Sequence, residues 1–240
     1  MVTQADFVSC LCITRQRVPL LRRAVDCFLA QTHAARELLI VCESDDPATR
    51  HFADAAAAAT AAVSDHPQIR VLEVPAEPKR TLGALRNLAI AAARGPFIAQ
   101  WDDDDWHSPA RLAAQIAAMR EHARPGCVLY RWTLYDAVAR HSYVSHERPW
   151  EGSLVARREA VPAYPELVRG EDVPVIQAML DAQQLVCLDA PELYVYIHHG
   201  ANTWDSAHFT EGVFPASQLL PDEATRHIEE VLGIVPSVHG

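Results

Sequence analysis

Four consecutive carboxylates, Asp102 to Asp105, are the most conspicuous chemical feature of the sequence. They directly follow an apolar run at 97–101 and precede a helix that begins near Ser108. Because adjacent carboxylates repel one another, local structure alone would not select such a run. Hard carboxylate oxygens suit Mg²⁺ or Mn²⁺, which commonly bind one or two protein carboxylates together with water and substrate phosphate. A solvated acidic turn that caps the helix is the structural alternative.

The position of the run within the predicted sheet favours a binding site. Side chains alternate along an extended segment, so Asp102 and Asp104 can face one ligand while Asp103 faces elsewhere. Ligands of open α/β sheets gather at the carboxyl ends of the strands, and the run lies at such an end.

A second acidic pair, Glu171-Asp172, follows Gly170 at the start of another predicted helix. Acidic residues are common at helix N-termini because they complement the macrodipole, and taken alone the pair needs no other explanation. This position should depress the pKa of Asp172. It could then act as a base only if the proton moved late, once the attacking hydroxyl had become acidic.

Two adjacent histidines, His198 and His199, follow a strand-like run at 193–197. Neutral imidazole is a common metal ligand. Adjacent residues of an extended chain point apart, so at most one of the two should bind a metal, and we favour His199. The sequence has 12 histidines, and a single one is more often a surface or hydrogen-bonded residue than a ligand.

Several further polar residues follow the predicted strands or flank a predicted helix. Each is an ordinary surface residue by itself, but together they should surround the same sheet edge as the aspartates. Lys79 and Arg80 precede the N-terminus of the helix predicted behind Thr81, where backbone N–H groups favour an anion. The full set of these polar residues is Thr14, Arg17, Glu43, Lys79, Arg80 and Arg86.

The first ninety-odd residues alternate β-rich runs with amphipathic stretches, which is the pattern of parallel strands joined by right-handed helical crossovers. Strands are predicted at 7–13, 38–42, 69–74 and 97–101. Helices are predicted behind Pro19, over 52–63 and behind Thr81.

After residue 106 the pattern becomes irregular. We predict one strand over 127–134, further strands at 143–145, 153–156 and 193–197, and helices near 112–123, 172–183 and 222–232. The change predicts one domain over 1–240, in which a nucleotide-type half at about 1–106 is followed by a variable substrate half at about 107–240; the resemblance described below makes them a nucleotide-sugar half and an acceptor half.

Composition narrows the function classes. The 240 residues are 50% hydrophobic and 22% charged, with a net charge of −10 that disfavours nucleic-acid binding and electrostatic coating of anionic membranes. No run reaches the roughly 18–20 apolar residues of a membrane span. The six cysteines form no CxxC pair, which fits a reducing compartment. We expect a cytoplasmic protein, or one peripheral at the inner membrane face, and leave a homo-oligomer open.

The motifs also occur in a specific order. It runs through Val8–Arg17, Glu37–Glu43, Gly83 with Arg86-Asn87, Gly95–Asp105, Gly170–Asp172 and His199–Trp204. This ordered set resembles family 2 glycosyltransferases of the GT-A fold over roughly residues 7–205. The resemblance implies an α/β fold of GT-A type, in which helices flank a Rossmann-like, mostly parallel central sheet and an irregular acceptor-side half follows.

The resemblance further implies a metal-dependent, inverting glycosyltransferase. It would move a sugar from a nucleoside-diphosphate sugar to a hydroxyl of a carbohydrate or glycolipid acceptor, in polysaccharide, glycolipid or glycoconjugate synthesis. The cofactor would be Mn²⁺ or Mg²⁺.

Roles carry over residue by residue. The nucleotide-sugar residues would be Thr14, Arg17, Glu43, Arg80, Arg86, Asp102 and Asp103. Asp104 and His199 would hold the metal, Asp172 would deprotonate the acceptor, and Glu171 and Trp132 would lie on the acceptor side, where Trp132 could stack on a sugar or simply pack in the core. The chain departs from the family pattern at Cys42–Asp45, where Asp-Asp-Gly-Ser is usual, and at Ile13, where Pro is common. These departures leave the nucleobase open.

Two alternatives remain. A sugar-phosphate nucleotidyltransferase places carboxylates and Mg²⁺ at a comparable edge, but it would want a glycine-rich phosphate loop, and Thr14–Arg17 contains no glycine. A catalytically inactive nucleotide- or carbohydrate-binding protein of the same fold is the other. A dinucleotide-dependent oxidoreductase is disfavoured because no GxGxxG follows the first strand.

Overall fold

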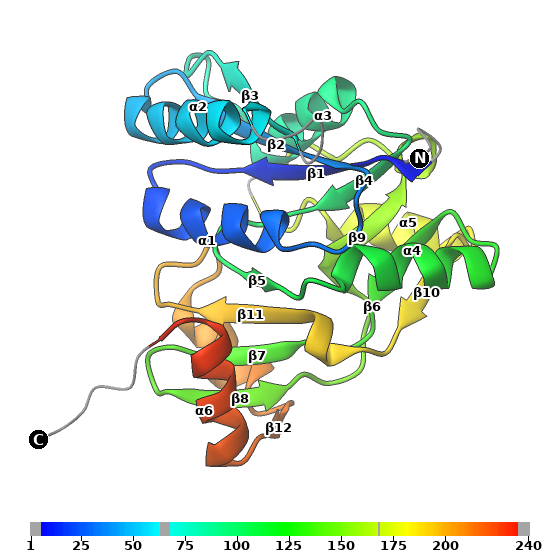
Figure 1. Ribbon diagram of the computed structural model, residues 1–240. Coiled ribbons are helices and arrows are strands. Elements are labelled where there is room, and N and C mark those ends of the chain that lie inside the picture. The colour runs from blue at the N-terminus through cyan, green and yellow to red at the C-terminus, as the bar shows by residue number, and fades with distance from the viewer. Residues whose placement is uncertain (1–5, 63–67, 168, 235–240) are drawn as a thin grey trace, which may run out of the picture.

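The computed structural model describes residues 6–62, 68–167 and 169–234, and within these ranges the strands form two sheets (Figure 1). The larger sheet has seven strands in the order β10-β6-β9-β4-β1-β2-β3. All of its pairs are parallel except those of β9 with β4 and with β6. Its strands are β1 (Val8–Ile13), β2 (Arg36–Glu43), β3 (Gln68–Val74), β4 (Phe97–Gln100), β6 (Gly126–Leu129), β9 (Trp150–Arg157) and β10 (Leu185–Leu188).

Helices cover both faces of this sheet. One face packs against α1 (Val18–Leu29), α2 (Pro47–Ala61) and α4 (Arg111–Glu121), and the other against α3 (Leu82–Ala92) and α5 (Val173–Asp181). Alternation along β1 shows the division, because Cys10 and Cys12 lie in the first core and Leu11 in the second. Five strands of this sheet are buried along most of their length, and their sequences are therefore mostly continuous apolar runs without polar alternation. These strands are β1, β2, β4, β6 and β9.

Local signals explain several of the helix starts. The Thr81 hydroxyl accepts a hydrogen bond from the Ala84 N–H at 3.3 Å, which caps α3 as predicted, and Asp46 caps α2 in the same way through Thr49. At the end of β4, the fully buried Trp101 donates its indole N–H to the Ala24 carbonyl of α1 at 3.0 Å. This bond fixes the point where the carboxylate run begins.

The smaller sheet has five strands in the order β12-β8-β7-β11-β5. It packs against the π-helix η4 (His208–Val213) on one face and α6 (Asp222–Val231) on the other. Short 3₁₀ helices lie at Arg158–Ala160 and Pro191–Leu193. The strands are β5 (Trp106–His107), β7 (Thr133–Asp136), β8 (His141–Val144), β11 (Tyr194–His198) and β12 (Gln218–Leu219).

The α/β fold with a mostly parallel, helix-flanked sheet is confirmed, but two details of the second half were wrong. The single strand predicted over 127–134 is two strands, β6 and β7, which belong to different sheets. The run is apolar throughout, so periodicity could not show where the chain crosses between sheets. The half expected to be irregular also supplies three strands of the large sheet and a sheet of its own. The single domain divided near residue 106 stays a prediction.

The helices in the described ranges include none that combines the length and the apolarity needed to cross a membrane.

At Gly83, α3 packs closely against the segment before α5, and a substitution at this position tests that packing. A Cβ at this position would lie 2.0 Å from the Pro165 carbonyl oxygen, so backbone would have to move. We expect Gly83→Ala to lower the free energy of unfolding by about 1–3 kcal/mol, although alanine favours the helix itself. Gly212→Ala is the control, because nothing lies within 4 Å of its Cβ. Urea denaturation checks this, and equal stability of Gly83→Ala and the parent would contradict the packing.

Candidate active site

The four carboxylates lie between β4 and β5, and alternate ones face alternate directions. Asp102 and Asp104 are partly exposed and Asp103 and Asp105 are buried, although all four line one cavity. The Thr14 hydroxyl donates to Asp103 Oδ2 at 2.5 Å. Asp102 and Asp104 thus share a face, in agreement with the alternation expected of an extended segment.

Asp105 ties the large sheet to the small one. Its carboxylate accepts the hydroxyl of Tyr194 and, at 3.0 Å, the backbone N–H of Ile197, both in β11. The carboxylate is 1% exposed. Because β11 leads directly into His198 and His199, this anchor sets where the histidines lie relative to the carboxylates.

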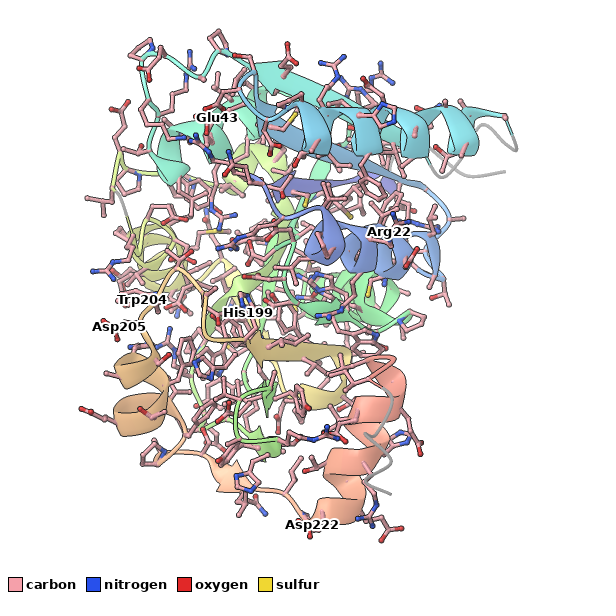
Figure 2. All side chains as sticks on the ribbon, turned by 90° about the vertical axis from the view of Figure 1, so that its left-hand side faces the viewer. Arg22, Glu43, His199, Trp204, Asp205 and Asp222 are labelled. Carbon is pink, nitrogen blue, oxygen red and sulfur yellow. The ribbon has the colours of Figure 1, made fainter. Side chains whose placement is uncertain are left out.

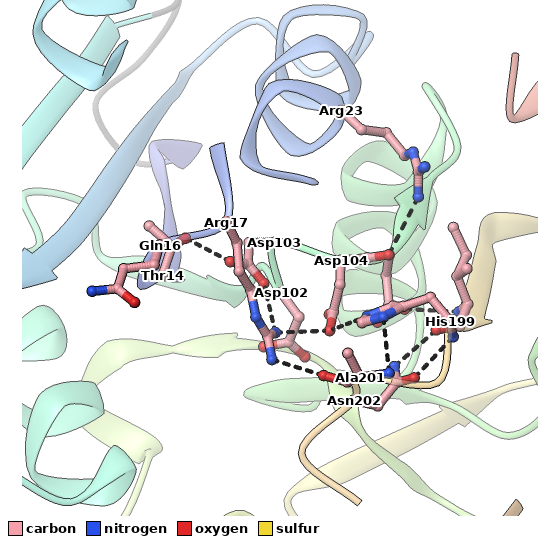
Figure 3. A network of polar contacts seen from close by, with 12 residues as sticks. Thr14, Gln16, Arg17, Arg23, Asp102, Asp103, Asp104, His199, Ala201 and Asn202 are labelled. Carbon is pink, nitrogen blue, oxygen red and sulfur yellow. Dashed lines mark hydrogen bonds and ion pairs between the residues drawn. The ribbon is translucent and has the colours of Figure 1, made fainter. Parts of the chain in front are cut away.

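His199 is the histidine that faces the carboxylate run. Its Nε2 lies 3.2 Å from Asp104 Oδ2 (Figure 3). His198 points the other way, with Nδ1 at 3.0 Å from Asp136 and Nε2 at 3.3 Å from the Ser206 hydroxyl. His199, and not His198, therefore lies beside Asp104, and its role as a metal ligand stays a prediction.

The Asp104–His199 pair could supply two ligands to a divalent cation. In the described part of the chain, three or more carboxylate, imidazole or thiolate groups do not converge into a complete protein cage. Magnesium-type ions are often bound by one or two protein ligands, with water and substrate phosphate filling the other positions. An oxygen and an imidazole nitrogen fit an ion held jointly by protein and diphosphate.

Burial and mutual repulsion disfavour the ionised form of the carboxylates in the run. Burial raises the pKa of Asp103 to about 6, with a further contribution from Asp104. The pKa of Asp102 is raised for the same reason, although Arg86 opposes the shift. Asp105, which is fully enclosed, has its pKa raised well above the usual range by burial and then by Asp104. The run therefore requires nearby positive charge to stay ionised.

Arg86 supplies part of that charge from α3. Its Nε donates to Glu171 Oε1 at 2.7 Å, and its Nη2 lies 3.4 Å from Asp102 Oδ1. Burial opposes the charge of this guanidinium, but Asp102 and Glu171 raise its pKa. Glu171 is 2% exposed and its Oε1 is held in this pair, while the residue lines the same cavity as Asp102, so its acceptor-side role stays a prediction.

Asp172 differs from the sequence-based expectation. We expected a depressed pKa at the N-terminus of α5, but burial raises the pKa to about 6, with Glu171 and Glu151 adding to the shift and Arg86 opposing it. The side chain makes no capping hydrogen bond to α5. The loss of water around the carboxylate outweighs the helix macrodipole here.

Two cavities meet at the carboxylate run. The aspartate cavity, of about 370 Å³, is lined by Asp102, Asp104 and Asp172 and by aromatic side chains of the second half. The Glu43 cavity, of about 350 Å³, lies at the ends of β1 and β2. Figure 2 shows Glu43, His199 and Trp204 on the same side of the molecule. Both cavities are lined by Ile13, Arg17, Leu82, Asp103 and Thr203.

Glu43 lies in its cavity with one oxygen paired and the other free of protein partners. Oε2 accepts from Arg15 at 2.7 Å and also contacts Lys79. Oε1 is buried and has no hydrogen-bond partner in the protein. An unpartnered buried acceptor beside a cavity suits a ligand N–H or O–H. Arg80 lines the same cavity but donates to the Pro75 carbonyl at 2.6 Å.

Trp132 belongs to an aromatic stack rather than to an open sugar platform. Its ring lies 4.7 Å from that of Trp150 and 4.6 Å from that of Tyr194, both in stacked arrangement. The residue is 5% exposed and lines the aspartate cavity as part of this stack. Its indole N–H is buried without a partner.

Gly152, in β9, was not singled out from the sequence. A Cβ there would lie 3.1 Å from Asp102 Oδ2 and 3.2 Å from the Trp132 ring, so the glycine keeps open the space between them. Glycine within a strand often marks a close approach, and this signal could have identified it. Arg148 and Glu151, which pair at the wall of the same cavity, carried no comparable signal.

Sequence comparison decides the family. The model of "Glycosyl transferase family 2" matches residues 9–166. The chain belongs to glycosyl transferase family 2. A search of curated proteins gave no significant match.

Solved structures share the fold at low identity. Staphylococcus aureus TarS 1-349 in complex with UDP-GlcNAc has a TM-score of 0.62 at 15% identity, covering 82% of this chain and 60% of that one. The mannosyltransferase PcManGT from Pyrobaculum calidifontis, in complex with GDP-Man and Mn²⁺, has a TM-score of 0.59 at 15% identity, covering 80% and 56%. The chain thus matches at most about three fifths of these structures. They are glycosyltransferases of the GT-A fold, which this family member shares.

The Arg86–Glu171 pair can be tested by a double-mutant cycle. Removing one partner leaves a buried charge uncompensated, so Arg86→Met alone should lower the free energy of unfolding by about 3–5 kcal/mol. Replacing both, as Arg86→Met with Glu171→Gln, should recover part of that loss because no unpaired Glu171 charge remains. Chemical denaturation of the four proteins measures the coupling. Strictly additive losses would show that the pair does not contribute as a unit.

Proposed function

We propose that this member of glycosyl transferase family 2 is a metal-dependent, inverting enzyme that transfers a sugar from a nucleoside-diphosphate sugar to an acceptor hydroxyl. One observation carries the proposal. Asp104, which lies 3.2 Å from His199, lines the same cavity as Asp172, so a candidate cation ligand and a partly buried carboxylate of raised pKa face one space. Such a space can hold a sugar between its leaving group and an incoming hydroxyl.

The donor spans both cavities. The nucleoside occupies the Glu43 cavity, where Glu43 Oε1 accepts from the base, and Thr14 fixes Asp103 beside it. The diphosphate crosses the shared boundary at Arg17, and the sugar enters the aspartate cavity beside Asp102. Structural neighbours that hold UDP-GlcNAc or GDP-Man with Mn²⁺ support this class of donor.

Asp104 and His199 would hold Mn²⁺ or Mg²⁺ beside the diphosphate of the donor. When bound, such an ion neutralises charge that develops on the departing nucleoside diphosphate, which is the largest electrostatic demand of the transfer. Arg86 keeps Asp102 ionised and in place, and through Glu171 it also orients the turn that carries Asp172.

Asp172 accepts the proton of the acceptor hydroxyl. The bond between the acceptor oxygen and the anomeric carbon forms as the bond from that carbon to the diphosphate oxygen breaks, and the configuration inverts in this single displacement. A carboxylate with a pKa near 6 is a stronger base than an ordinary aspartate and is still ionised at neutral pH. The acceptor is a carbohydrate or glycolipid whose hydroxyl approaches beside the aromatic stack.

A donor screen tests the proposal. Purified protein is incubated with a panel of nucleoside-diphosphate sugars, Mn²⁺ and a mixture of oligosaccharide and glycolipid acceptors, and free nucleoside diphosphate is measured. We expect metal-dependent release with at least one donor. Release of pyrophosphate from a nucleoside triphosphate and a sugar phosphate would instead indicate a nucleotidyltransferase. Calorimetry that finds no metal-dependent binding of any nucleoside diphosphate would overturn the proposal.

Asp104→Asn should weaken metal-dependent nucleotide binding at least about tenfold, because the amide is a poorer ligand for a hard cation than the carboxylate. Titration calorimetry with nucleoside diphosphate, with and without Mn²⁺, measures the loss. Asp181→Asn is the control, since Asp181 pairs with Gln177 on the exposed side of α5. If Asp104→Asn kept the full enhancement by Mn²⁺, Asp104 would not be a ligand.

Asp172→Asn should keep donor binding and lose at least about 10²-fold in transfer rate, because the amide cannot accept the proton. In the parent, the rate should rise with pH and level off above an apparent pKa of about 6, as Asp172 ionises. The rate of nucleoside diphosphate release from pH 5 to 8 checks both points. A parental rate in the variant would remove Asp172 from this role.

Stability provides an independent check on the same variant. The pKa of Asp172 is higher in the folded chain than in the unfolded one, so the folded chain binds more protons between about pH 4 and 6 and this group destabilises it as the pH rises through that window. Asp172→Asn should therefore raise Tm by about 2–4 °C at pH 7.5, and this gain should vanish near pH 4.

A further inference from the structure

Arg17 lies where the Glu43 cavity and the aspartate cavity meet. It follows β1 as the residue before α1, and its side chain is about one third exposed. Its Nη1 lies 3.1 Å from Asp104 Oδ2 and 3.5 Å from Asp103 Oδ1. The Arg17 guanidinium therefore lies next to Asp104, the carboxylate that is proposed to bind the metal ion.

The same side chain also reaches across to the loop after β11. Its Nη2 donates to the Ala201 carbonyl at 3.1 Å, which joins parts of the chain 184 residues apart (Figure 3). Thr203, two residues further along this loop, lines both cavities together with Arg17. One arginine thus holds the loop at 199–204 against the carboxylate run.

Ala201 in turn orients His199. Its backbone N–H donates to His199 Nδ1 at 3.3 Å, so the hydrogen of the neutral ring is on Nε2, which points at Asp104 Oδ2 from 3.2 Å. That single oxygen accepts from both His199 and Arg17. A cation cannot occupy this position while both donors do, so the observed arrangement is closed to a metal ion.

We propose that Arg17 is an exchangeable latch whose guanidinium leaves Asp104 and Ala201 for the diphosphate of the incoming donor. The proposal rests on the proposed function, because that donor provides its second partner. A guanidinium binds phosphate oxygens with the same planar fork that it uses for carboxylates. A diphosphate that links a nucleoside in one cavity to a sugar in the other must pass this side chain.

The exchange keeps the charges of the site balanced. Asp102 to Asp105 are four adjacent carboxylates of which Asp103 and Asp105 are buried, and Arg17 lies within 3.5 Å of both Asp103 and Asp104. In the donor-free chain Arg17 provides one positive charge at Asp104. When it moves to the diphosphate, a divalent cation takes its place, so the run always has a counter-charge. Metal and nucleotide then bind cooperatively, and the loop at 199–204 is released only as they bind.

The latch and a simple phosphate ligand predict different affinities for Mn²⁺ in the absence of nucleotide. Arg17→Met removes the charge but keeps most of the length of the side chain. We expect Mn²⁺ without nucleotide to bind about three- to tenfold tighter, because Asp104 loses a competing cation. The affinity for nucleoside diphosphate with Mn²⁺ should fall about tenfold, because a charge-assisted bond to phosphate is lost. Free Mn²⁺ is measured by electron paramagnetic resonance, and nucleotide affinity by calorimetry with a panel of nucleoside diphosphates.

Arg15→Met is the matched control. Arg15 lies on the same turn but pairs with Glu43 and Asp45, both at 2.7 Å, and not with the carboxylate run. It should leave the affinity for Mn²⁺ alone unchanged. If Arg17→Met also left it unchanged, or weakened it, Arg17 would be a phosphate ligand or a structural residue and the latch would be wrong. Failure of every nucleoside diphosphate to bind the parent with Mn²⁺ would instead overturn the proposed function.

Hydrogen exchange of the parent protein tests the latch without any variant. Nucleoside diphosphate with Mn²⁺ should raise the exchange rate of the 199–204 amides at least about threefold, because the loop is released. Mn²⁺ alone at low concentration should leave this rate unchanged. Equal exchange in the free and the doubly bound protein would contradict the release of this loop, whatever the behaviour of Arg17→Met.

Discussion

Four carboxylates can lie within one short segment only because each is held by a different part of the chain. Asp102 faces Arg86 of α3, Asp103 accepts from Thr14 after β1, Asp104 meets Arg17 and His199, and Asp105 is enclosed by β11. This distribution turns a repulsive sequence into a junction between the two sheets. The positions of both cavities follow from it, since both are lined by Asp103 and by Arg17, which lies 3.5 Å from it.

Function and stability are opposed in this arrangement. The water-poor surroundings that raise the pKa of Asp172 make its carboxylate a better proton acceptor and also make its charge costly to the fold. Arg86 limits the cost, because one guanidinium faces both Asp102 and Glu171, the neighbour of Asp172. Similar reasoning applies to Glu43, whose unpartnered Oε1 is a cost in the free chain that a ligand donor can repay.

The sequence predicted most of what depends on local pattern. Apolar runs located β1, β2, β3 and β4, Thr81 marked the start of α3, and alternation matches the burial of Asp103 between the more exposed Asp102 and Asp104. It failed where partners are distant in the chain. Nothing in a local window reveals that Glu171 pairs with a residue 85 positions earlier, or that Trp132 stacks on Trp150 and Tyr194. The pKa of Asp172 was wrong for the same reason, because burial comes from tertiary packing and not from its place at a helix start.

The enclosed Asp105 has a mechanical consequence. Its oxygens bond to Tyr194 and to the Ile197 amide, so β11 cannot slide along the large sheet without breaking buried hydrogen bonds. β11 also pairs with β5 and β7, and the aromatic stack rests on the same strands. Remodelling of the small sheet for a bulkier or differently shaped acceptor would therefore be transmitted to His199 as a shift of the whole strand. Sequence change should be tolerated best in strands β8 and β12, which pair with neither Asp105 nor β11.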